Sequence, residues 1–121
     1  MRDAPPVETA STPTDVQRLF RGLIGTGRLG SGERLPTVRQ AAEDFGVAPG
    51  TVQKAYRALE AEGLIVSRVG SGTRVAPGVA VVSAGMARQL RAIIEAASAD
   101  GVEIETLVDV LRLLGDDARS S

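Results

Sequence analysis

The sequence of 121 residues contains no cysteine and no histidine. The first absence excludes disulfides, thiolate nucleophiles and cysteine-based zinc sites, and the second excludes histidine metal sites and Ser–His triads. Aromatic residues are confined to Phe20, Phe45 and Tyr56, which are too few to stack along single-stranded nucleic acid. The composition therefore argues against an enzyme and favours a binding module that uses no cofactor.

Long uncharged runs are also lacking. The longest extends from Val75 to Ala87, and it is interrupted by Pro77, Gly78 and Gly85, so it is too short and too broken for a membrane span. The N-terminus has no apolar segment of the kind that signal peptides need. We therefore expect a cytoplasmic protein. Its length suits either one domain of ordinary size or a small domain plus an appendage.

Charge is spread unevenly along the chain. Residues 28–75 carry seven cations and five anions, whereas residues 76–121 carry four cations and seven anions. Arginine supplies every cation except Lys54. A mildly basic middle is weak evidence for nucleic-acid binding by itself, because solvated helix faces often carry such charge.

Apolar periodicity and local start and stop signals predict an ordered series of elements. We expect helices over 13–25, 37–46 and 49–62, followed by strands over 64–68 and 73–75 that flank a tight turn. Thr37 and Gln40 have the spacing of a capping box at the start of the second helix. A helix-turn-helix followed by a hairpin is a winged helix, which suits a major groove and a neighbouring backbone or minor groove.

The predicted fold class is α+β and mostly α, with three parts. Residues 1–11 are polar and proline-containing and predict a disordered leader, residues 12–76 a winged helix-turn-helix domain, and residues 77–121 a pair of helices. The apolar stripes of this pair could complete a single-chain core, but two helices have too little surface to bury both, so a homodimer interface is favoured. Its expected residues are Met86, Leu90, Ile93, Ile94, Ala97, Ile104, Leu107, Val108, Leu111 and Leu114.

One motif is discounted. Residues 25–30 read Gly-Thr-Gly-Arg-Leu-Gly and match the GxGxxG pattern of dinucleotide-binding loops. That mechanism needs the loop to follow a strand and to open a helix, whereas here it follows a predicted helix and precedes a non-helical segment. We interpret residues 25–30 as a flexible connector.

Several spaced elements agree, in order, with one known family. They are Leu35-Pro36-Thr37 with Arg39, then Thr51-Val52, Ala55-Tyr56, Leu59-Glu60, Gly63-Leu64-Ile65 and Gly70-Ser71-Gly72-Thr73. On these residues the chain strongly resembles the DNA-binding domain of GntR-family transcription regulators, and with the first helix the resemblance covers residues 13–75. The 46 residues after Val75 are similar to the small YtrA-type subfamily, in which two C-terminal helices mediate dimerisation.

The resemblance implies roles for the helices at the major groove. It places Arg39 at a base edge, although an ion pair with Glu43 one turn on is the alternative. Gln53 and Lys54 occupy groove-reading positions, and both would also suit a solvated helix face. Pro49 and Gly50 also belong to this group, although they lack side-chain donors where some relatives have arginine or asparagine. Thr37 and Thr51 would hold phosphate oxygens or simply cap their helices. Arg57 would contact the DNA backbone or pair with Glu60.

The resemblance also implies that the wing approaches the minor groove through its small residues. These are Gly70, Ser71, Gly72 and Thr73, although turn geometry alone would also explain the two glycines. Arg68 and Arg74 flank the turn and would neutralise phosphates. Arg74 stands where the family usually has phenylalanine, which implies either a less firmly packed wing or an added phosphate contact.

We therefore expect a homodimeric repressor that binds a palindromic operator in double-stranded DNA. The alternative is a protein-interaction module that uses a winged-helix scaffold without binding DNA. An enzyme is a distant third hypothesis, because no pair of carboxylates is placed in a plausible cleft. A small-molecule effector stays open, because no residue identifies one.

Overall fold

The computed structural model of the chain describes residues 10–120 and forms two compact units, Met1–Val82 and Ser83–Ser121. Residues 1–9 of the expected leader lie outside the described residues. The division falls later than the expected boundary at 76/77 because the connecting segment stays with the first unit. There the Gly78 N–H donates to the Ser31 hydroxyl at 3.2 Å, and the Val82 N–H donates to the Gly25 carbonyl at 2.8 Å.

The first helix, α1 (Pro13–Gly25), starts at the predicted residue because its N-terminus is capped from both sides. The Thr12 hydroxyl accepts the Asp15 N–H at 3.1 Å, and the Asp15 carboxylate accepts the Thr12 N–H at 3.3 Å. The carboxylate also accepts the backbone N–H of Ser11, the first cause of the lowered pKa of Asp15. Ala10 is buried against the core, so the folded unit begins before Thr12.

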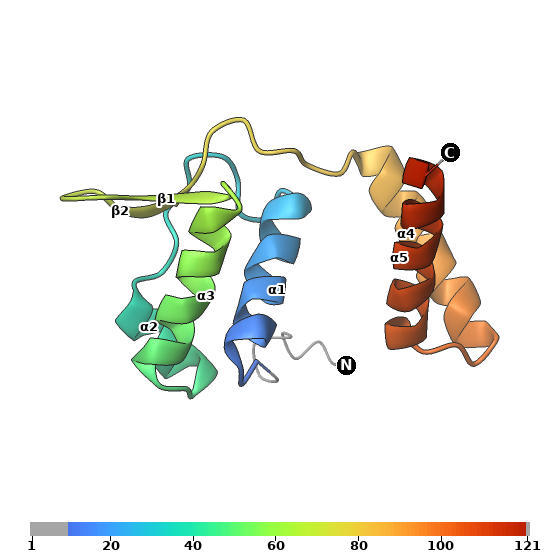
Figure 1. Cartoon of the computed structure of the whole chain (residues 1–121), viewed down its shortest axis with the longest axis horizontal. Coiled ribbons are helices and arrows are strands. Elements are labelled where there is room, and N and C mark those ends of the chain that lie inside the picture. The colour runs from blue at the N-terminus through green and yellow to red at the C-terminus, as the bar shows by residue number, and fades with distance from the viewer. Residues whose placement is uncertain (1–9, 121) are drawn as a thin grey trace. The chain divides into compact units, whose positions relative to one another are not determined.

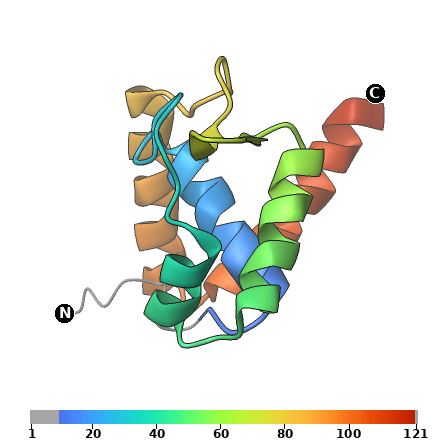
Figure 2. The ribbon, with the colours of Figure 1, turned by 90° about the vertical axis from the view of Figure 1, so that its left-hand side faces the viewer.

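The helices α2 (Val38–Phe45) and α3 (Pro49–Ala61) form the expected helix-turn-helix. The capping box at the start of α2 is confirmed, with the Thr37 hydroxyl accepting the Gln40 N–H at 3.1 Å. Gly46 ends α2 at φ +69°, a left-handed conformation that glycine adopts without the Cβ clash of other residues. Figure 2, which faces these two helices, shows them joined by a short turn beneath the hairpin.

The wing consists of β1 (Ile65–Arg68) and β2 (Gly72–Val75), paired antiparallel from Ile65 opposite Val75 to Arg68 opposite Gly72. The expected hairpin is confirmed, and Figure 1 shows that it projects beyond the helices of its own unit. A third, short segment that was not predicted pairs with the outer side of β2. The Leu35 N–H donates to the Thr73 carbonyl at 2.8 Å, and the Val75 N–H donates to the Glu33 carbonyl at 2.9 Å.

The core of the first unit lies between α1, α3 and the base of the wing. Tyr56 packs edge-on against Phe20, with ring centroids 5.5 Å apart, and its hydroxyl donates to the Pro36 carbonyl at 2.7 Å. Burial raises the pKa of this phenol, so the hydroxyl stays protonated and keeps donating. The other buried residues include Val16, Ile24, Leu35, Ala41, Ala42, Val52, Ala55, Leu59, Ile65 and Val75.

The second unit is the expected helix pair, α4 (Ala84–Ala99) and α5 (Ile104–Ser120). The Ser83 hydroxyl caps α4 by accepting the Met86 N–H at 3.1 Å. Of the ten residues predicted for the dimer interface, Ala97 is buried and Leu90, Leu107 and Val108 are half-buried. The other six are exposed, so the described unit leaves much of its apolar surface without cover.

Candidate nucleic-acid interface

The outward side of α3 carries the polar residues expected at a groove. Gln53, Lys54 and Arg57 are exposed, whereas Val52, Ala55, Tyr56 and Leu59 face the core. This division follows from the helical period, which puts residues 53, 54 and 57 on one side of the helix. We call Gly50, Thr51, Gln53, Lys54 and Arg57 the α3 face.

The α3 face lines a shallow hollow of about 440 Å³, together with Pro13 and Ala48. Within residues 10–120, neither Lys54 nor Arg57 has an ion pair, so the alternative pairing of Arg57 with Glu60 is not formed. Two unpaired cations on a concave surface would favour an anionic ligand, because an unpaired charge attracts counter-ions more strongly than a paired one.

The N-terminus of α3 adds partial positive charge to this surface. Its N-cap is Ala48, which has no side-chain acceptor, and Pro49 occupies the first helical position. The first amides of α3 therefore lack the side-chain cap that Thr12 and Thr37 provide for α1 and α2. Uncapped amides at a helix N-terminus are suited to hold phosphate oxygens.

Arg39 and Thr37 lie at the start of α2, outside the hollow that the α3 face lines. The Arg39 side chain is exposed, and within the described chain it forms no ion pair with Glu43. Thr37 is committed to the capping box, which leaves its hydroxyl only its remaining hydrogen-bonding capacity for a phosphate. The structure thus leaves Arg39 available for a ligand and explains Thr37 by capping.

The wing residues form a tight turn whose conformation requires glycine. Gly70 and Gly72 have φ of +86° and +76°, which side chains with a Cβ rarely adopt. Arg68 is exposed at the end of β1, opposite Gly72. The two glycines are therefore explained by the turn, and Arg68 is free to approach a phosphate.

Two arginines brace the wing, and only one of them was considered from the sequence. Arg34 donates to the Ser71 carbonyl at 3.2 Å, and its guanidinium lies against Gly72. Arg74 is half-buried and donates to the Gly32 carbonyl at 3.1 Å, so its guanidinium is turned toward the unit's own backbone. The role of Arg34 depends on pairing between segments far apart in sequence, and its only local signal is the place next to Leu35-Pro36.

The other end of α3 is fixed to α1 by a polar cluster. Arg21 of α1 pairs with Glu62, the C-cap of α3, at 2.6 Å, and Gln17 donates to the same carboxylate. The hydrogen bond from Arg21 is the main cause that lowers the pKa of Glu62. This cluster sets the position of α3 relative to α1 near its C-terminus, away from the α3 face.

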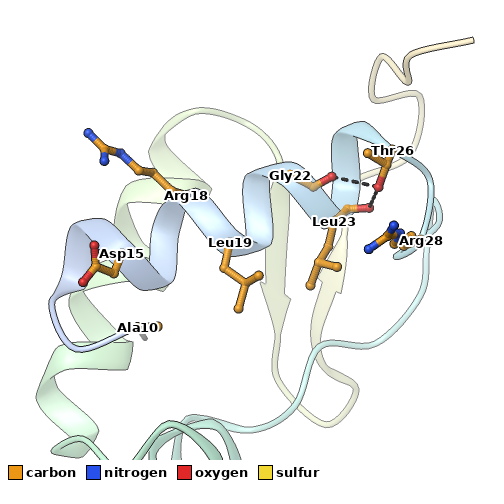
Figure 3. Close-up of a pocket in the computed structure, with 8 residues that line it drawn as sticks. All are labelled: Ala10, Asp15, Arg18, Leu19, Gly22, Leu23, Thr26 and Arg28. Atoms are coloured by element: carbon orange, nitrogen blue, oxygen red, sulfur yellow. Dashed lines mark hydrogen bonds between the residues drawn. The ribbon is translucent and has the colours of Figure 1, made fainter. Parts of the chain in front are cut away.

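A second hollow, of about 440 Å³, lies along the solvent side of α1 (Figure 3). Leu19, Leu23 and Gly22 line it, with Asp15 and Arg18 toward its N-terminal end and Thr26 and Arg28 toward its C-terminal end. The Thr26 hydroxyl is occupied, because it donates to the Gly22 carbonyl at 2.9 Å. Arg18 points outward to solvent, so the hollow presents mainly leucine side chains.

Two searches of the described residues found nothing. Between residues 10 and 120, no group of three or more acidic side chains is arranged to hold a metal ion. No helix in that part of the chain has the length and apolarity needed to cross a bilayer.

A helix-turn-helix with an exposed cationic second helix, followed by a braced hairpin, defines the class of winged-helix DNA-binding domains. The profile of the bacterial regulatory proteins of the gntR family matches residues 13–75. The chain belongs to the GntR family of transcription regulators, as its resemblance predicted. The relatives that it matches are regulators and not enzymes.

Similarity that extends beyond the winged domain is found to YtrA regulators. The HTH-type transcriptional repressor YtrA of Bacillus subtilis is 34% identical over 117 residues, which cover 91% of this chain and 90% of that protein. The structure of YtrA from Sulfolobus acidocaldarius, a GntR-family transcription factor, matches with a TM-score of 0.52 and 33% identity over 72% of this chain and 85% of that one.

Similarity to several other regulators covers about half of this chain. The AraR DNA-binding domain, solved in complex with operator ORX1, matches with a TM-score of 0.51 and 31% identity over 53% of this chain and 77% of that one. Two further curated relatives are much longer, and the chain spans 16% of the length of one and 12% of the other. The winged unit is thus shared among regulators that differ in the rest of their chains.

Proposed function

We propose that this protein is a homodimeric repressor that binds a palindromic operator in double-stranded DNA. The α3 face enters the major groove, Arg39 reads a base edge from α2, and the wing tip reaches the adjacent minor groove. The observation that carries the proposal concerns the cations at the start of α2 and on α3. They are exposed and have no ion pair within residues 10–120, and they lie beside a helix N-terminus without a side-chain cap.

Individual residues then divide into two groups by their effect on DNA. Arg39 and Gln53 have donors that suit base edges in the major groove, where a bidentate pair contributes about 1–3 kcal/mol of discrimination. The residues that suit phosphates, which position the protein without reading sequence, are Thr51, Lys54, Arg57 and Arg68. The AraR domain, bound to its operator in the solved structure, supports this use of the shared fold.

The test of DNA binding is a fluorescence-anisotropy titration of the full chain. The probes are the duplex upstream of the protein's own gene and a scrambled duplex of equal composition. We expect tighter binding to the native duplex. Arg39→Ala should reduce that preference, whereas Arg68→Ala should weaken binding to both duplexes alike. Equal affinity for native and scrambled duplexes would contradict the proposal.

The support for a dimer is the apolar surface of the helix pair. Leu111 and Leu114 have exposed fractions of 54% and 58%, and Met86, Ile93, Ile94 and Ile104 are exposed as well. Large contiguous apolar surfaces are rare on monomers, because burying apolar surface lowers the free energy by roughly 25 cal/mol per Å². A second copy would cover this surface by two-fold symmetry and would also present two α3 faces to one operator.

Sedimentation equilibrium tests the dimer directly. The wild-type chain should sediment as a dimer, and Leu111→Glu should sediment as a monomer, because a charged carboxylate is costly to bury. The matched control is Ala80→Glu, which adds the same carboxylate at an exposed position in the connector between the two units. A monomeric wild-type chain would remove the dimer from the proposal.

A further inference from the structure

The tip of the wing carries an apolar side chain that the fold does not use. Val69 has an exposed fraction of 108%, the highest of the large apolar residues in the described chain. It is the first residue of the turn, because the last strand pair joins Arg68 to Gly72. Since the side chain is fully exposed, folding gains nothing from an isopropyl group at this position.

The turn that presents Val69 is held in place. Arg34 donates to the Ser71 carbonyl at 3.2 Å, and the Ser71 N–H donates to the Arg68 carbonyl at 3.2 Å. At the base of the turn, the hydroxyls of Ser67 and Thr73 lie 3.3 Å apart across the strands. Val69 is therefore displayed on a braced loop, and ordering it on binding would cost little conformational entropy.

A backbone donor lies beside the valine. Within residues 10–120, the N–H of Gly70 has no acceptor, in contrast to the N–H of Ser71. Gly70 has no side chain to shield this amide from a close surface, because only glycine fits its φ of +86°. The tip thus presents one apolar group and one unpaired hydrogen-bond donor next to each other.

These two groups match one kind of base pair in a minor groove. The floor of the groove at an A·T or T·A pair offers only acceptors, whereas a G·C pair adds the guanine 2-amino group, which is a donor. The amino group would face the Gly70 donor and would lose water to the Val69 methyls without gaining an acceptor. An A·T pair, in contrast, offers its acceptor to Gly70 and leaves room for the valine.

From this juxtaposition we infer that Val69 makes the wing a selector against guanine in the minor groove, so that each operator half-site requires an A·T or T·A pair beneath the wing. The inference rests on the proposed function, which brings the wing to that groove. A and T are interchangeable at this position, because the minor-groove pattern does not distinguish their order. Replacing the pair with G·C weakens binding about tenfold per half-site, in the range of ordinary single mismatches.

The experiment starts with selection of duplexes from a random pool by the full-length wild-type chain. Each position flanking the selected core is then set to A·T, T·A, G·C or inosine·C, and the affinity is measured by anisotropy. Inosine·C has the major-groove edge of G·C but lacks the 2-amino group, so it isolates the minor-groove effect. We expect one position per half-site where G·C binds about tenfold more weakly and inosine·C binds like A·T.

Val69→Thr is the decisive variant because threonine has nearly the shape of valine but adds an acceptor for the guanine amino group. It should reduce the discrimination against G·C to about twofold while leaving the melting temperature unchanged. Val102→Thr makes the same change at an exposed site in the second unit and should behave as wild type. Equal binding of G·C and inosine·C, or undiminished discrimination in Val69→Thr, would overturn the inference alone. Failure to select any duplex would overturn the proposed function along with it.

Discussion

The salt dependence of DNA binding provides a quantitative test of the α3 face. In the proposed dimer, Lys54, Arg57 and Arg68 of each protomer lie at phosphates, which makes about six neutralised charges per operator. Release of counter-ions then gives a slope of about −5.4 in a plot of log K against log salt concentration. Between 50 and 200 mM salt the association constant should fall by roughly 2,000-fold.

Removing Arg57 should change this slope in a defined way. Arg57 is exposed and, in the described chain, is not paired with Glu60, so its charge is available to DNA. Arg57→Ala removes two charges from the dimer, which lowers the magnitude of the slope to about 3.6 and the loss over the same salt range to roughly 150-fold. The measurement is anisotropy on the native duplex at five or more salt concentrations.

The matched control is Arg28→Ala. Arg28 is also exposed, but it lies away from the α3 face. It follows the C-terminal end of α1, whereas the hollow with the α3 face is lined by Pro13, at the N-terminal end of α1. This variant should keep the wild-type slope. A slope that does not change in Arg57→Ala, or that changes equally in both variants, would refute the placement of Arg57 at a phosphate. A wild-type slope near −2.7 would instead indicate that a monomer binds.

Two further predictions concern the frame that positions the interface. Tyr56→Phe removes the hydrogen bond to the Pro36 carbonyl while keeping the ring against Phe20, so the free energy of unfolding in urea should fall by about 1–2 kcal/mol, and an unchanged midpoint would contradict the role of this bond. Glu62→Gln tests the cluster with Arg21, which lowers the pKa of Glu62 below its ordinary value of 4.5. Because the folded-state pKa is lowered, the stabilisation is present above about pH 4.5 and is lost as the pH falls through the folded-state pKa. Wild type and variant should thus differ by about 0.5 kcal/mol at pH 7 and converge as the pH falls below the folded-state pKa of Glu62, whereas a constant difference would exclude the ion pair as its cause.

The helices could be predicted because their signals are local. Thr12 with Asp15, and Thr37 with Gln40, lie within one turn of each other, so their capping geometry is visible in the sequence. The inward residues of α3 followed from the helical period, and the separation of Gln53, Lys54 and Arg57 from the core followed with them.

The parts that escaped prediction depend on contacts between distant segments. The pairing of residues 33–35 with β2 joins backbone groups about forty positions apart, and it has no side-chain signature. Arg34 acquires its role only through that pairing. The connector at 77–82 stays with the first unit through single hydrogen bonds to Ser31 and Gly25. The periodicity of apolar residues in the sequence does not predict such bonds. Val69 lies beside the turn residues of the family pattern, and its significance comes from exposure that the sequence does not state.

The segment at 33–35 has a consequence for how this regulator could acquire a new operator. It pairs with β2 on one side and leads directly through Pro36 into α2, so a single short span connects the wing to Arg39. The length of this span fixes the distance between the wing and Arg39, and therefore the number of base pairs between the positions that they contact. New operators would therefore arise by exchanging side chains on a constant spacing. A chimera that grafts foreign α2 and α3 helices onto this chain should carry residues 32–36 with them. A graft that starts at Thr37 would separate the two DNA-reading helices from the segment that fixes their distance to the wing.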